Sequence, residues 1–394
     1  MVNAINQRQT LFTLSMDTDK AFDGVWRQGL VVKLQNQDFQ PEIIRLINSF
    51  MKDRYISVTI DNINSVWMPI EAGVPQGAVL SPLLYNLYVA DMPIPTTPDT
   101  EAVHFADDQL LMAWGEQADE AARNLELFAN QTKKYCDKWK IAINPEKCQF
   151  LKVTGILKYK SYRTRRLTKN ATITIGGLQP QAVTALKYLG VTFTNRYEFQ
   201  LHARKMAERC DKAYHAINHL FRNRNLHVDV KRTLYKTLIR PCATYAFSSW
   251  SSLSSAQMEN LRANERRILR QIHLAHGRKP ETGHFINSTL LYKDTDISRF
   301  DRVAFMNAVR FYRRAAECPN ELVSKHFEEQ TNAINDACAV TVVDSPLRLL
   351  GEFNSGDAFD GNGKLVYFHR AKSNGREVYN TNQNTTTDTL GNLI

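Results

Sequence analysis

The sequence predicts an α+β fold followed by a basic helical region, and three observations support this. Strand-like and helix-like patterns alternate through residues 1–150, short strand-like runs follow to about residue 195, and long amphipathic patterns begin near residue 199. The chain has 394 residues, 43% of them hydrophobic, which is enough for two or three domains with real cores. The expected segments are 1–195, 196–280, 281–373 and 374–394.

The first elements are read from apolar spacing. The run LFTLSM at residues 11–16 predicts a buried strand that ends where acidic residues begin. Apolar positions from Val25 to Leu34 recur at helical spacing, and Pro41 suits the first turn of a second helix. The expected buried side of that second helix comprises Ile43, Ile44, Ile47 and Phe50.

The later elements follow from turn residues and periodicity. Ser81 and Pro82 form an expected N-cap and N1 pair that opens a helix reaching Tyr88. The other expected elements are a hairpin of 55–60 and 66–70, a helix at 119–140, strands at 150–153, 171–175 and 187–193, and helices at 199–222, 228–247 and 255–274. The Asn- and Thr-rich tail from residue 374 is expected to have no fixed structure.

Charge is distributed unevenly along the chain. Residues 1–150 carry 13 Lys and Arg against 19 Asp and Glu, residues 151–280 carry 25 against 6, and residues 281–394 carry 12 against 15. Clustered Lys and Arg suit a phosphate backbone, and grouped carboxylates suit a divalent metal. A solvated basic face is the alternative, which charge alone does not exclude.

Several protein classes are disfavoured. There is no apolar run of about eighteen residues and no signal-peptide pattern at the start, so neither membrane insertion nor secretion is expected. Six cysteines lie far apart without the spacing of zinc ligands, which predicts reduced core residues in an intracellular protein. No basic cluster distinguishes the nucleus from the cytoplasm.

Two acidic clusters carry the chemistry. Asp107 and Asp108 lie between apolar runs, at the expected tip of a hairpin, where their mutual repulsion is unfavourable without cations. Asp17 begins a second cluster where the first strand ends. If the two strands are neighbours, these carboxylates converge and can hold two divalent ions for phosphoryl transfer. Magnesium suits an all-oxygen ligand set.

The acidic clusters and one glycine-containing segment each have other interpretations. An Asp–Asp pair alone is most often a solvated turn. A calcium loop starting at Asp17 is excluded, because Phe22 stands where the loop needs Gly and Gln28 where it needs Glu. The segment GVPQGA at 73–78 would, alone, be a turn into a helix whose glycines allow close backbone approach.

Taken together, five segments resemble the reverse transcriptase domain of non-LTR (LINE-type), jockey-like retrotransposons. They occur in the family's order over about residues 11–195 and are MDTDKAFDGVW, AGVPQGAVLSPLLYNLYVADM, HFADDQLL, INPEKCQFL and LKYLGVTF. The resemblance continues more loosely to about residue 275. It implies a right-hand polymerase palm with an antiparallel sheet and packed helices, followed by a helical thumb.

The resemblance implies catalytic roles for the matching residues. Asp17 and Asp107 would be the principal ligands of two Mg²⁺ ions, for which Mn²⁺ is a substitute, and Asp108 would complete the pair. Phe22 would lie under the sugar of the incoming deoxynucleoside triphosphate and exclude a 2′-hydroxyl. Lys147 would neutralise or protonate the pyrophosphate leaving group, whereas the simpler interpretation of Asn144–Lys147 is a surface turn.

The resemblance also implies contacts with the RNA template and the DNA primer. Gly73, Pro75, Gln76 and Gly77 would serve the template and the nascent base pair. Tyr188, Leu189 and Gly190 would grip the primer end, whereas the simpler interpretation of Leu186–Phe193 is a plain core strand. The basic residues expected to line the thumb are Arg204, Lys205, Arg209, Lys212, Arg222, Arg224, Lys231, Arg232, Lys236, Arg262, Arg266, Arg267 and Arg270.

The expected function is that of an RNA-directed DNA polymerase. Only sixteen residues precede Asp17, so the fingers are expected to be largely missing, and the alternative is a catalytically dead, truncated nucleic-acid-binding remnant. An unrelated structural protein gives no reason for HFADDQ and GVPQG to coexist. Residues 281–373 are expected to form a helical extension, in which Asp294, Asp296 and Asp301 lend little weight to a nuclease.

Overall fold

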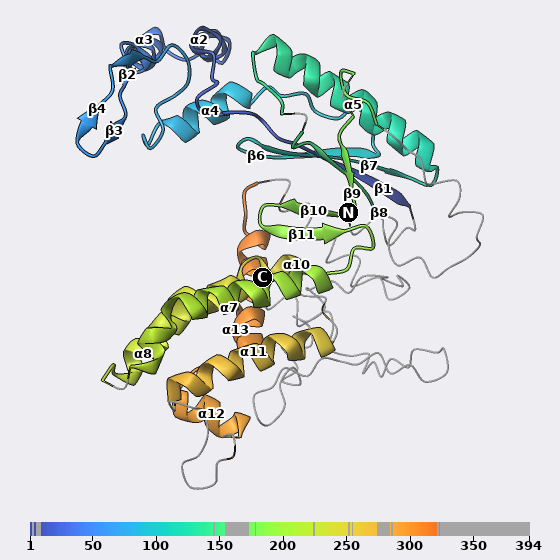
Figure 1. The fold of residues 1–394 in the computed structure, drawn as a ribbon. Coiled ribbons are helices and arrows are strands. Elements are labelled where there is room, and N and C mark those ends of the chain that lie inside the picture. Colours follow the sequence, from blue (N-terminus) through green and yellow to red (C-terminus); the bar gives the residue numbers. More distant parts are fainter. Residues whose placement is uncertain are drawn as a thin grey trace. The chain divides into compact units, whose positions relative to one another are not determined.

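The computed structural model divides into two compact units, Met1–Tyr197 and Glu198–Ile394 (Figure 1). The structure describes residues 9–153, 173–273 and 287–320, without Pro145, Leu178, Arg224, Ser251, Ser252 and Ser254, and in addition Met1, Ala4, His284 and Val323. The expected unstructured tail from residue 374 lies outside the described residues. The first unit carries the sheet, and the described residues of the second unit are mainly helical.

The first unit is built on a five-stranded sheet with the order β6-β7-β1-β8-β9. Neighbouring strands are antiparallel except for the parallel pair β8 and β9. The strands are β1 (Thr10–Met16), β6 (Thr100–Phe105), β7 (Asp108–Gly115), β8 (Gln149–Val153) and β9 (Gln181–Val183). The strands expected at 11–16 and 150–153 are therefore confirmed, and β1 lies at the centre.

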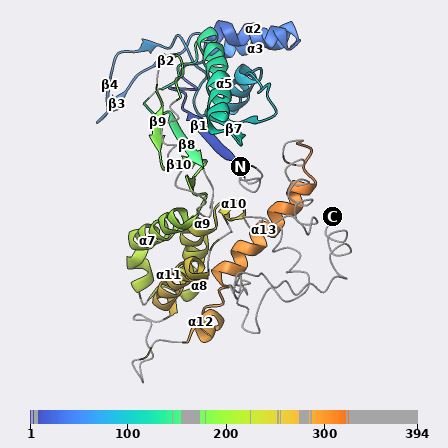
Figure 2. The same cartoon turned by 90° about the vertical axis from the view of Figure 1, so that its right-hand side faces the viewer.

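One face of this sheet is covered by the long helix α5 (Ala118–Lys138), as both views show (Figures 1 and 2). Phe12, Leu14 and Met16 of β1 share a buried cluster with Leu125 and Phe128 of α5. The helix expected at 119–140 is confirmed. Because side chains alternate along a strand, the residue after Met16 points to the face opposite α5.

A second core joins three further helices to the end of α5, and a buried lysine lies within it. The helices are α2 (Arg27–Asn36), α3 (Pro41–Met51) and α4 (Ser81–Val89). Lys33 is 2% exposed, and its Nζ lies 4.0 Å from the ring centroid of Trp139 and 2.5 Å from the Asp91 carboxylate. The ammonium also lies over the rings of Tyr88 and Tyr135. This buried charge therefore links α2, α4 and α5.

Helix α3 begins at Pro41 as expected, but its buried face differs from the prediction. Ile44, Ile47 and Met51 are buried, whereas Ile43 is 41% exposed and Phe50 is 37% exposed. The buried positions follow an i, i+3, i+7 stripe, and the two exposed residues each lie one position before a buried one. The prediction was correct for Ile44 and Ile47 and wrong for Ile43 and Phe50.

Helix α4 begins one residue earlier than the expected cap at Ser81 implies. Leu80 occupies the N-cap position, and Ser81 and Pro82 fall within the first turn. The Ser81 hydroxyl donates to the carbonyl of Pro75 instead of accepting from the helix. The predicted Ser81 cap is therefore wrong, because this hydroxyl ties the helix to the preceding loop.

The segment between α3 and α4 forms an interrupted hairpin. Strand β2 (Tyr55–Ile56) pairs with β5 (Met68–Pro69), and β3 (Thr59–Ile60) pairs with β4 (Ile63–Asn64). Asp61 and Asn62 both have positive φ, of 49° and 66°, which suits a two-residue type I′ turn. The expected hairpin is confirmed in position, but its pairing breaks in the middle and all four strands are exposed.

A second hairpin follows the sheet. Strand β10 (Ala185–Tyr188) pairs with β11 (Val191–Thr194) through the turn Leu189–Gly190. The single strand predicted at 187–193 is therefore wrong, because the chain reverses at its midpoint. The strand predicted at 171–175 lies partly outside the described residues, and Ile173 and Ile175 are buried without belonging to a named strand.

The second unit is a set of packed helices. They are α7 (Gln200–Arg222), α8 (Val228–Leu234), η1 (Tyr235–Ile239), α9 (Arg240–Thr244), α10 (Phe247–Trp250), α11 (Ser255–His273), α12 (Ser288–Thr295) and α13 (Phe300–Ala316). The helices expected at 199–222 and 255–274 are confirmed. Among the described residues, no helix is both long enough and apolar enough to cross a lipid bilayer.

The helix expected at 228–247 is interrupted by a π-turn. The backbone N–H of Arg240 donates to the carbonyl of Tyr235, five residues earlier, across η1. Pro241 follows directly, and a proline inside a helix has no N–H to donate and clashes with the carbonyl four residues before it. The widened turn accommodates this proline, and the helix ends at Thr244, three residues earlier than predicted.

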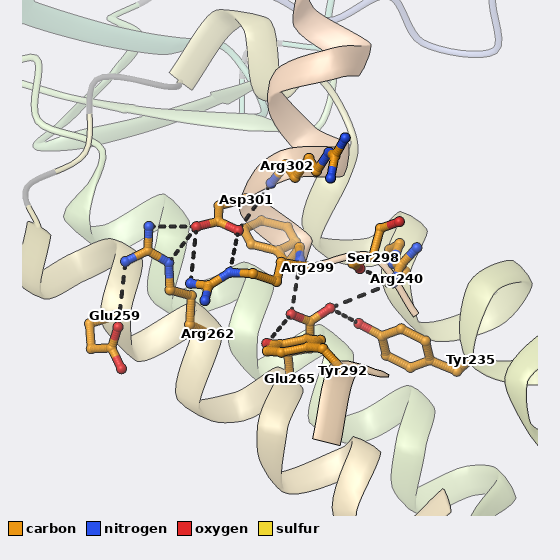
Figure 3. Close-up of polar contacts among 11 residues, drawn as sticks. Tyr235, Arg240, Glu259, Arg262, Glu265, Tyr292, Ser298, Arg299, Asp301 and Arg302 are labelled. Carbon is orange, nitrogen blue, oxygen red and sulfur yellow. Dashed lines mark hydrogen bonds and ion pairs between the residues drawn. The ribbon is translucent and has the colours of Figure 1, made fainter. Parts of the chain in front are cut away.

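A buried polar network joins α11 to α12 and α13 (Figure 3). Glu265 is 4% exposed and accepts hydrogen bonds from the hydroxyls of Tyr235 at 2.6 Å and Tyr292 at 2.7 Å. Asp301 is fully buried, 2.6 Å from a guanidinium nitrogen of Arg262, and 3.3 Å from Nε of Arg299. Residues 288–316 are thus anchored within the second unit.

This network also bears on the weak nuclease interpretation. Asp294 and Asp296 are exposed, whereas Asp301 is buried against two arginines. Among the residues that the structure describes, these three carboxylates form no metal-binding group. Asp301 therefore has a structural role.

Candidate active site

Two strand registers bring Asp17 between an acidic and a basic side chain. Met16 of β1 pairs with Gln109 of β7, and Ser15 pairs with Gln149 of β8. Continuing both registers beyond the strand end places Asp17 level with Asp108 on one side and Lys147 on the other. The Lys147 ammonium lies 3.3 Å from Oδ2 of Asp17.

The Asp107–Asp108 pair lies at the tip of the β6–β7 hairpin. Phe105 pairs with Asp108, so Ala106 and Asp107 form a two-residue turn. Ala106 has a φ of 53°, in the left-handed region that disfavours a residue with a Cβ by roughly 1–2 kcal/mol. The expected hairpin tip is confirmed, and the backbone strain lies beside the acidic pair, as is common at functional sites.

The three carboxylates influence one another. Burial raises the pKa of Asp108 above its ordinary value, and the negative charges of Asp107 and Asp17 raise it further. Oδ2 of Asp17 is buried and, among the described residues, has no partner at hydrogen-bond geometry, despite its proximity to Lys147. Such a group of crowded carboxylates is stabilised by added positive charge.

The fit of a divalent metal can be tested on these residues. Hard cations prefer carboxylate oxygens, and this site offers three carboxylates with an unsatisfied oxygen. In the described part of the chain, no three acidic, His or Cys side chains already stand in metal-binding positions. The fit to a metal therefore rests on the chemistry of the three carboxylates and on the unsatisfied Oδ2 of Asp17.

The turn that carries Lys147 is held against β1. The backbone N–H of Asn144 donates to the carbonyl of Asp17 at 2.8 Å, and the Asn144 side chain accepts from the N–H of Glu146 at 3.2 Å. The simpler interpretation of this segment as a surface turn describes its backbone. The Lys147 side chain, however, is directed to the acidic site, where it pairs with Asp17.

The loop after β1 presents Phe22 beside a buried tyrosine. The ring centroid of Phe22 lies 5.0 Å from that of Tyr85 on α4, and the two planes meet at 25°. Phe22 is half-buried, and Tyr85 is 2% exposed. Sequence reasoning missed Tyr85, because it lies in an apolar stripe of α4 that is indistinguishable from ordinary core.

The GVPQG segment lies against this same loop. The N–H groups of Gly73 and Val74 donate to the carbonyls of Val25 at 2.8 Å and Phe22 at 2.9 Å. The Gln76 amide donates to the Asp23 carboxylate at 2.8 Å. Pro75 accepts from Ser81 through its carbonyl. The segment expected to contact the template and nucleotide therefore lies beside Phe22.

Gly73 and Gly77 both have left-handed backbones, with φ of 80° and 82°, but their surroundings differ. A Cβ on Gly73 would lie 2.7 Å from the Asp23 backbone, whereas one on Gly77 would meet nothing within 4 Å. We expect Gly73→Ala to lower the free energy of unfolding by about 1–3 kcal/mol more than Gly77→Ala, because only Gly73→Ala forces two backbones apart. Urea unfolding of the two variants measures this difference, and equal losses would contradict the close approach.

Two arginines that sequence reasoning did not identify bind the backbone at the start of the GVPQG segment. Arg27 donates to the carbonyls of Ile70 at 2.6 Å and Ala72 at 3.1 Å, and Arg54 donates to that of Gly73 at 3.1 Å. Isolated arginines give no motif, so no local signal could have identified them. They fix the backbone that precedes the GVPQG segment.

The β10–β11 hairpin brings Tyr188 toward the acidic site. Its hydroxyl donates to the carbonyl of Val103 on β6 at 3.4 Å. Burial, followed by the charge of Asp108, raises the pKa of Tyr188 to about 12. Leu189 and Gly190 form the turn, with φ of 44° and 83°. The three residues expected at the primer end therefore share one hairpin tip in the first unit.

The described basic residues named for the thumb lie on α7, α8, η1 and α11 of the second unit. Arg204 and Lys205 are exposed on α7, where Arg204 makes a loose ion pair with Glu208 at 3.7 Å. Arg266 on α11 is 18% exposed and bonded to Glu259, and Arg270 is half-buried. Of these four, Arg204 and Lys205 present their charge most openly. Arg224 lies outside the described residues.

Comparison with known families identifies the class of the front part. Residues 2–193 match the family model described as reverse transcriptase (RNA-dependent DNA polymerase). This range contains the acidic hairpin, the GVPQG segment and the β10–β11 hairpin except for its last residue, Thr194. The chain therefore carries a reverse transcriptase domain, as its sequence resemblance predicted.

The domain is homologous to the RNA-directed DNA polymerases of non-LTR retrotransposons, and by ancestry it is an enzyme. The polymerase from mobile element jockey of Drosophila melanogaster is 27% identical over 282 residues, covering 69% of this chain and 29% of that protein. The probable polymerase from transposon X-element of the same species is 27% identical, covering 82% and 34%. The matched region thus spans about a third of the length of these relatives.

Among solved structures, apo telomerase from Candida tropicalis is similar. It is 12% identical with a TM-score of 0.37, and the match covers 78% of this chain and 48% of that one.

Proposed function

We propose that this chain is an RNA-directed DNA polymerase that extends a DNA primer along an RNA template. The proposal rests chiefly on the convergence of Asp17, Asp107 and Asp108 at the ends of β1 and β7. In this proposal the five-stranded sheet and its helices are the palm, and the helices of the second unit are the thumb. The substrates are deoxynucleoside triphosphates.

Asp17, Asp107 and Asp108 would hold two Mg²⁺ ions, with Mn²⁺ as a substitute. Two such metal ions activate the primer 3′-hydroxyl and neutralise charge on the phosphate that is transferred. Lys147, whose ammonium already lies 3.3 Å from Asp17, would place positive charge beside the departing pyrophosphate. The buried Oδ2 of Asp17, which has no hydrogen-bond partner among the described residues, supports its assignment as a ligand.

The surrounding residues would bind and orient the substrates. Phe22 would lie under the sugar and exclude a 2′-hydroxyl, and Gln76 and Gly77 would contact the incoming nucleotide. Gly73 and Pro75 would contact the template, and their support is the network that packs this segment against the Phe22 loop. Tyr188, Leu189 and Gly190 would hold the primer end. The support is that the charge of Asp108 contributes to the raised pKa of Tyr188.

Primer extension tests this function. The purified chain is given an RNA template, an annealed DNA primer, Mg²⁺ and all four deoxynucleotides, and a parallel reaction contains Mn²⁺. We expect elongation in both. An absence of elongation in both reactions, with template binding intact, would instead identify a nucleic-acid-binding remnant.

Salt dependence tests the proposed thumb separately from catalysis. Removing one side chain that binds a phosphate should reduce the slope of log K against log[salt] by about 0.9. We expect the double variant Arg204→Ala/Lys205→Ala to reduce the slope of template–primer binding by about 2. Fluorescence anisotropy at several salt concentrations measures the slope.

Lys134→Ala serves as the control for the salt experiment. Lys134 is also exposed, but it lies on α5, which covers the sheet face opposite the carboxylates. This variant should leave the slope unchanged. If both variants had the parent's slope, Arg204 and Lys205 would be excluded as phosphate contacts.

A further inference from the structure

Tyr85 is a buried aromatic residue that connects two parts of the proposed nucleotide site. Its ring stacks on Phe22 with centroids 5.0 Å apart, and only 2% of the residue is exposed. Among the described residues, Phe22 has no other ring contact at this range. The half-buried Phe22 ring therefore rests on Tyr85.

The backbone of Phe22 is held independently of this stack. Its carbonyl accepts from the N–H of Val74 at 2.9 Å, and Gly73 packs so closely that a Cβ there would lie 2.8 Å from the same carbonyl oxygen. The main chain of Phe22 is therefore fixed by the GVPQG segment. The position of its ring depends on what lies beneath it.

The other end of Tyr85 reaches toward the acidic site. Burial raises the pKa of Tyr85, and the charge of Asp107 raises it further. The Tyr85 hydroxyl is buried, and it lies beside the hydroxyl of Thr18, the residue that follows Asp17. One buried side chain thus extends from the Phe22 ring to Thr18, beside Asp17.

We propose that Tyr85 is a positioning residue that sets how strictly the enzyme excludes ribonucleotides, by holding the Phe22 ring in place. This inference rests on the polymerase function proposed above. A 2′-hydroxyl would push Phe22 toward Tyr85, and a close-packed interior yields little. A smaller residue at position 85 leaves a space into which the Phe22 ring retreats, so the sugar pocket widens.

The test compares Tyr85→Leu with the conservative variant Tyr85→Phe. Each protein is bound to an RNA template and a chain-terminated DNA primer, so no turnover occurs, and the Kd values for dATP and ATP opposite uracil are measured by competition. We expect Tyr85→Leu to lower the ratio of the Kd for ATP to the Kd for dATP by about tenfold. This is the scale of discrimination that packing alone provides. Tyr85→Phe keeps the stacked ring and should keep the parent's ratio.

Two further variants separate positioning from general destabilisation. Leu84→Ala removes a neighbouring residue of the same core, 2% exposed on the same helix, and should leave the ratio unchanged. In a Phe22→Ala background, Tyr85→Leu should cause no further loss, because the residue through which it acts is gone. A full additional loss in that background would show that Tyr85 acts by another route and overturn the inference.

The outcome for this inference is distinct from that for the polymerase proposal. A parent chain that prefers dATP, with a ratio that Tyr85→Leu leaves unchanged, overturns the role of Tyr85 alone. A parent chain that prefers dATP but never extends a normal primer overturns the polymerase while the role of Tyr85 in nucleotide selection stands. A parent that binds both nucleotides equally overturns the Phe22 gate and this inference with it.

Discussion

Replacing Asp107 with Asn is expected to reduce the rate of primer extension by about a thousandfold or more, equivalent to roughly 4 kcal/mol of lost transition-state stabilisation. The substitution keeps the size of the side chain but removes one of the charges that would hold the metal pair. Single-turnover extension with saturating template–primer and Mg²⁺ measures the effect. Because the charge of Asp107 raises the pKa of Asp108, the same change also lowers that pKa toward its ordinary value.

A matched control is available on the same unit. Asp38 is exposed, lies after α2 and has a left-handed backbone with a φ of 56°, which Asn accepts readily. Asp38→Asn makes the same chemical change away from the site and should retain the parent's rate. Extension by Asp107→Asn at more than about a tenth of the parent's rate would exclude Asp107 as a principal metal ligand.

The largest expected loss of stability comes from Asp301→Asn in the second unit. The change leaves the guanidinium groups of Arg262 and Arg299, which are 4% and 15% exposed, without their buried counter-charge. Removing one partner of a buried ion pair typically lowers stability by about 3–5 kcal/mol. Hydrogen exchange followed by mass spectrometry reports the opening of α11 and α13 separately from the first unit.

The exposed pair of Glu208 with Arg204 provides the comparison. Its side chains are 59% and 71% exposed and 3.7 Å apart, so Glu208→Gln should change protection very little. Pairing Asp301→Leu with Arg262→Met should recover part of the loss, because it removes one of the two uncompensated charges. Unchanged protection of α11 and α13 in Asp301→Asn would contradict the stabilising role of the network.

The sequence predicted those elements whose pattern is local. The apolar stripe of α5 and the run at 11–16 each determine their own structure, and both were found within two residues of the expected bounds. The face of α3 was harder to predict. Ile43 and Phe50 are as apolar as Ile44 and Ile47, and only the position of the neighbouring helices decides which of them is buried.

The reversal at Leu189–Gly190 was missed for a related reason. The residues on either side are apolar enough to read as one strand, and only the second residue of the turn is a glycine. A two-residue turn therefore leaves little trace in the pattern. The hairpin becomes evident only when Tyr188 and Val191 are seen to pair.

The acidic site could be predicted only by assuming that two particular strands are adjacent. Sequence reasoning required the first strand to neighbour the strand of Asp107, and no local feature specifies which strands are adjacent. The register of β1 with β7 supplies that condition. The contributions of Arg27, Arg54 and Tyr85 depend on contacts between distant residues, so the motifs alone could not reveal them.

The π-turn in the second unit has a consequence for how related sequences are aligned. Tyr235 and Arg240, five residues apart, both reach Glu265, at 2.6 Å and 3.7 Å. In a regular α-helix, residues five apart point in directions that differ by about 140°. A relative that lacks the π-turn should therefore need a one-residue gap between these positions. An ungapped alignment would match Arg240 to a residue on the wrong side of that relative's helix.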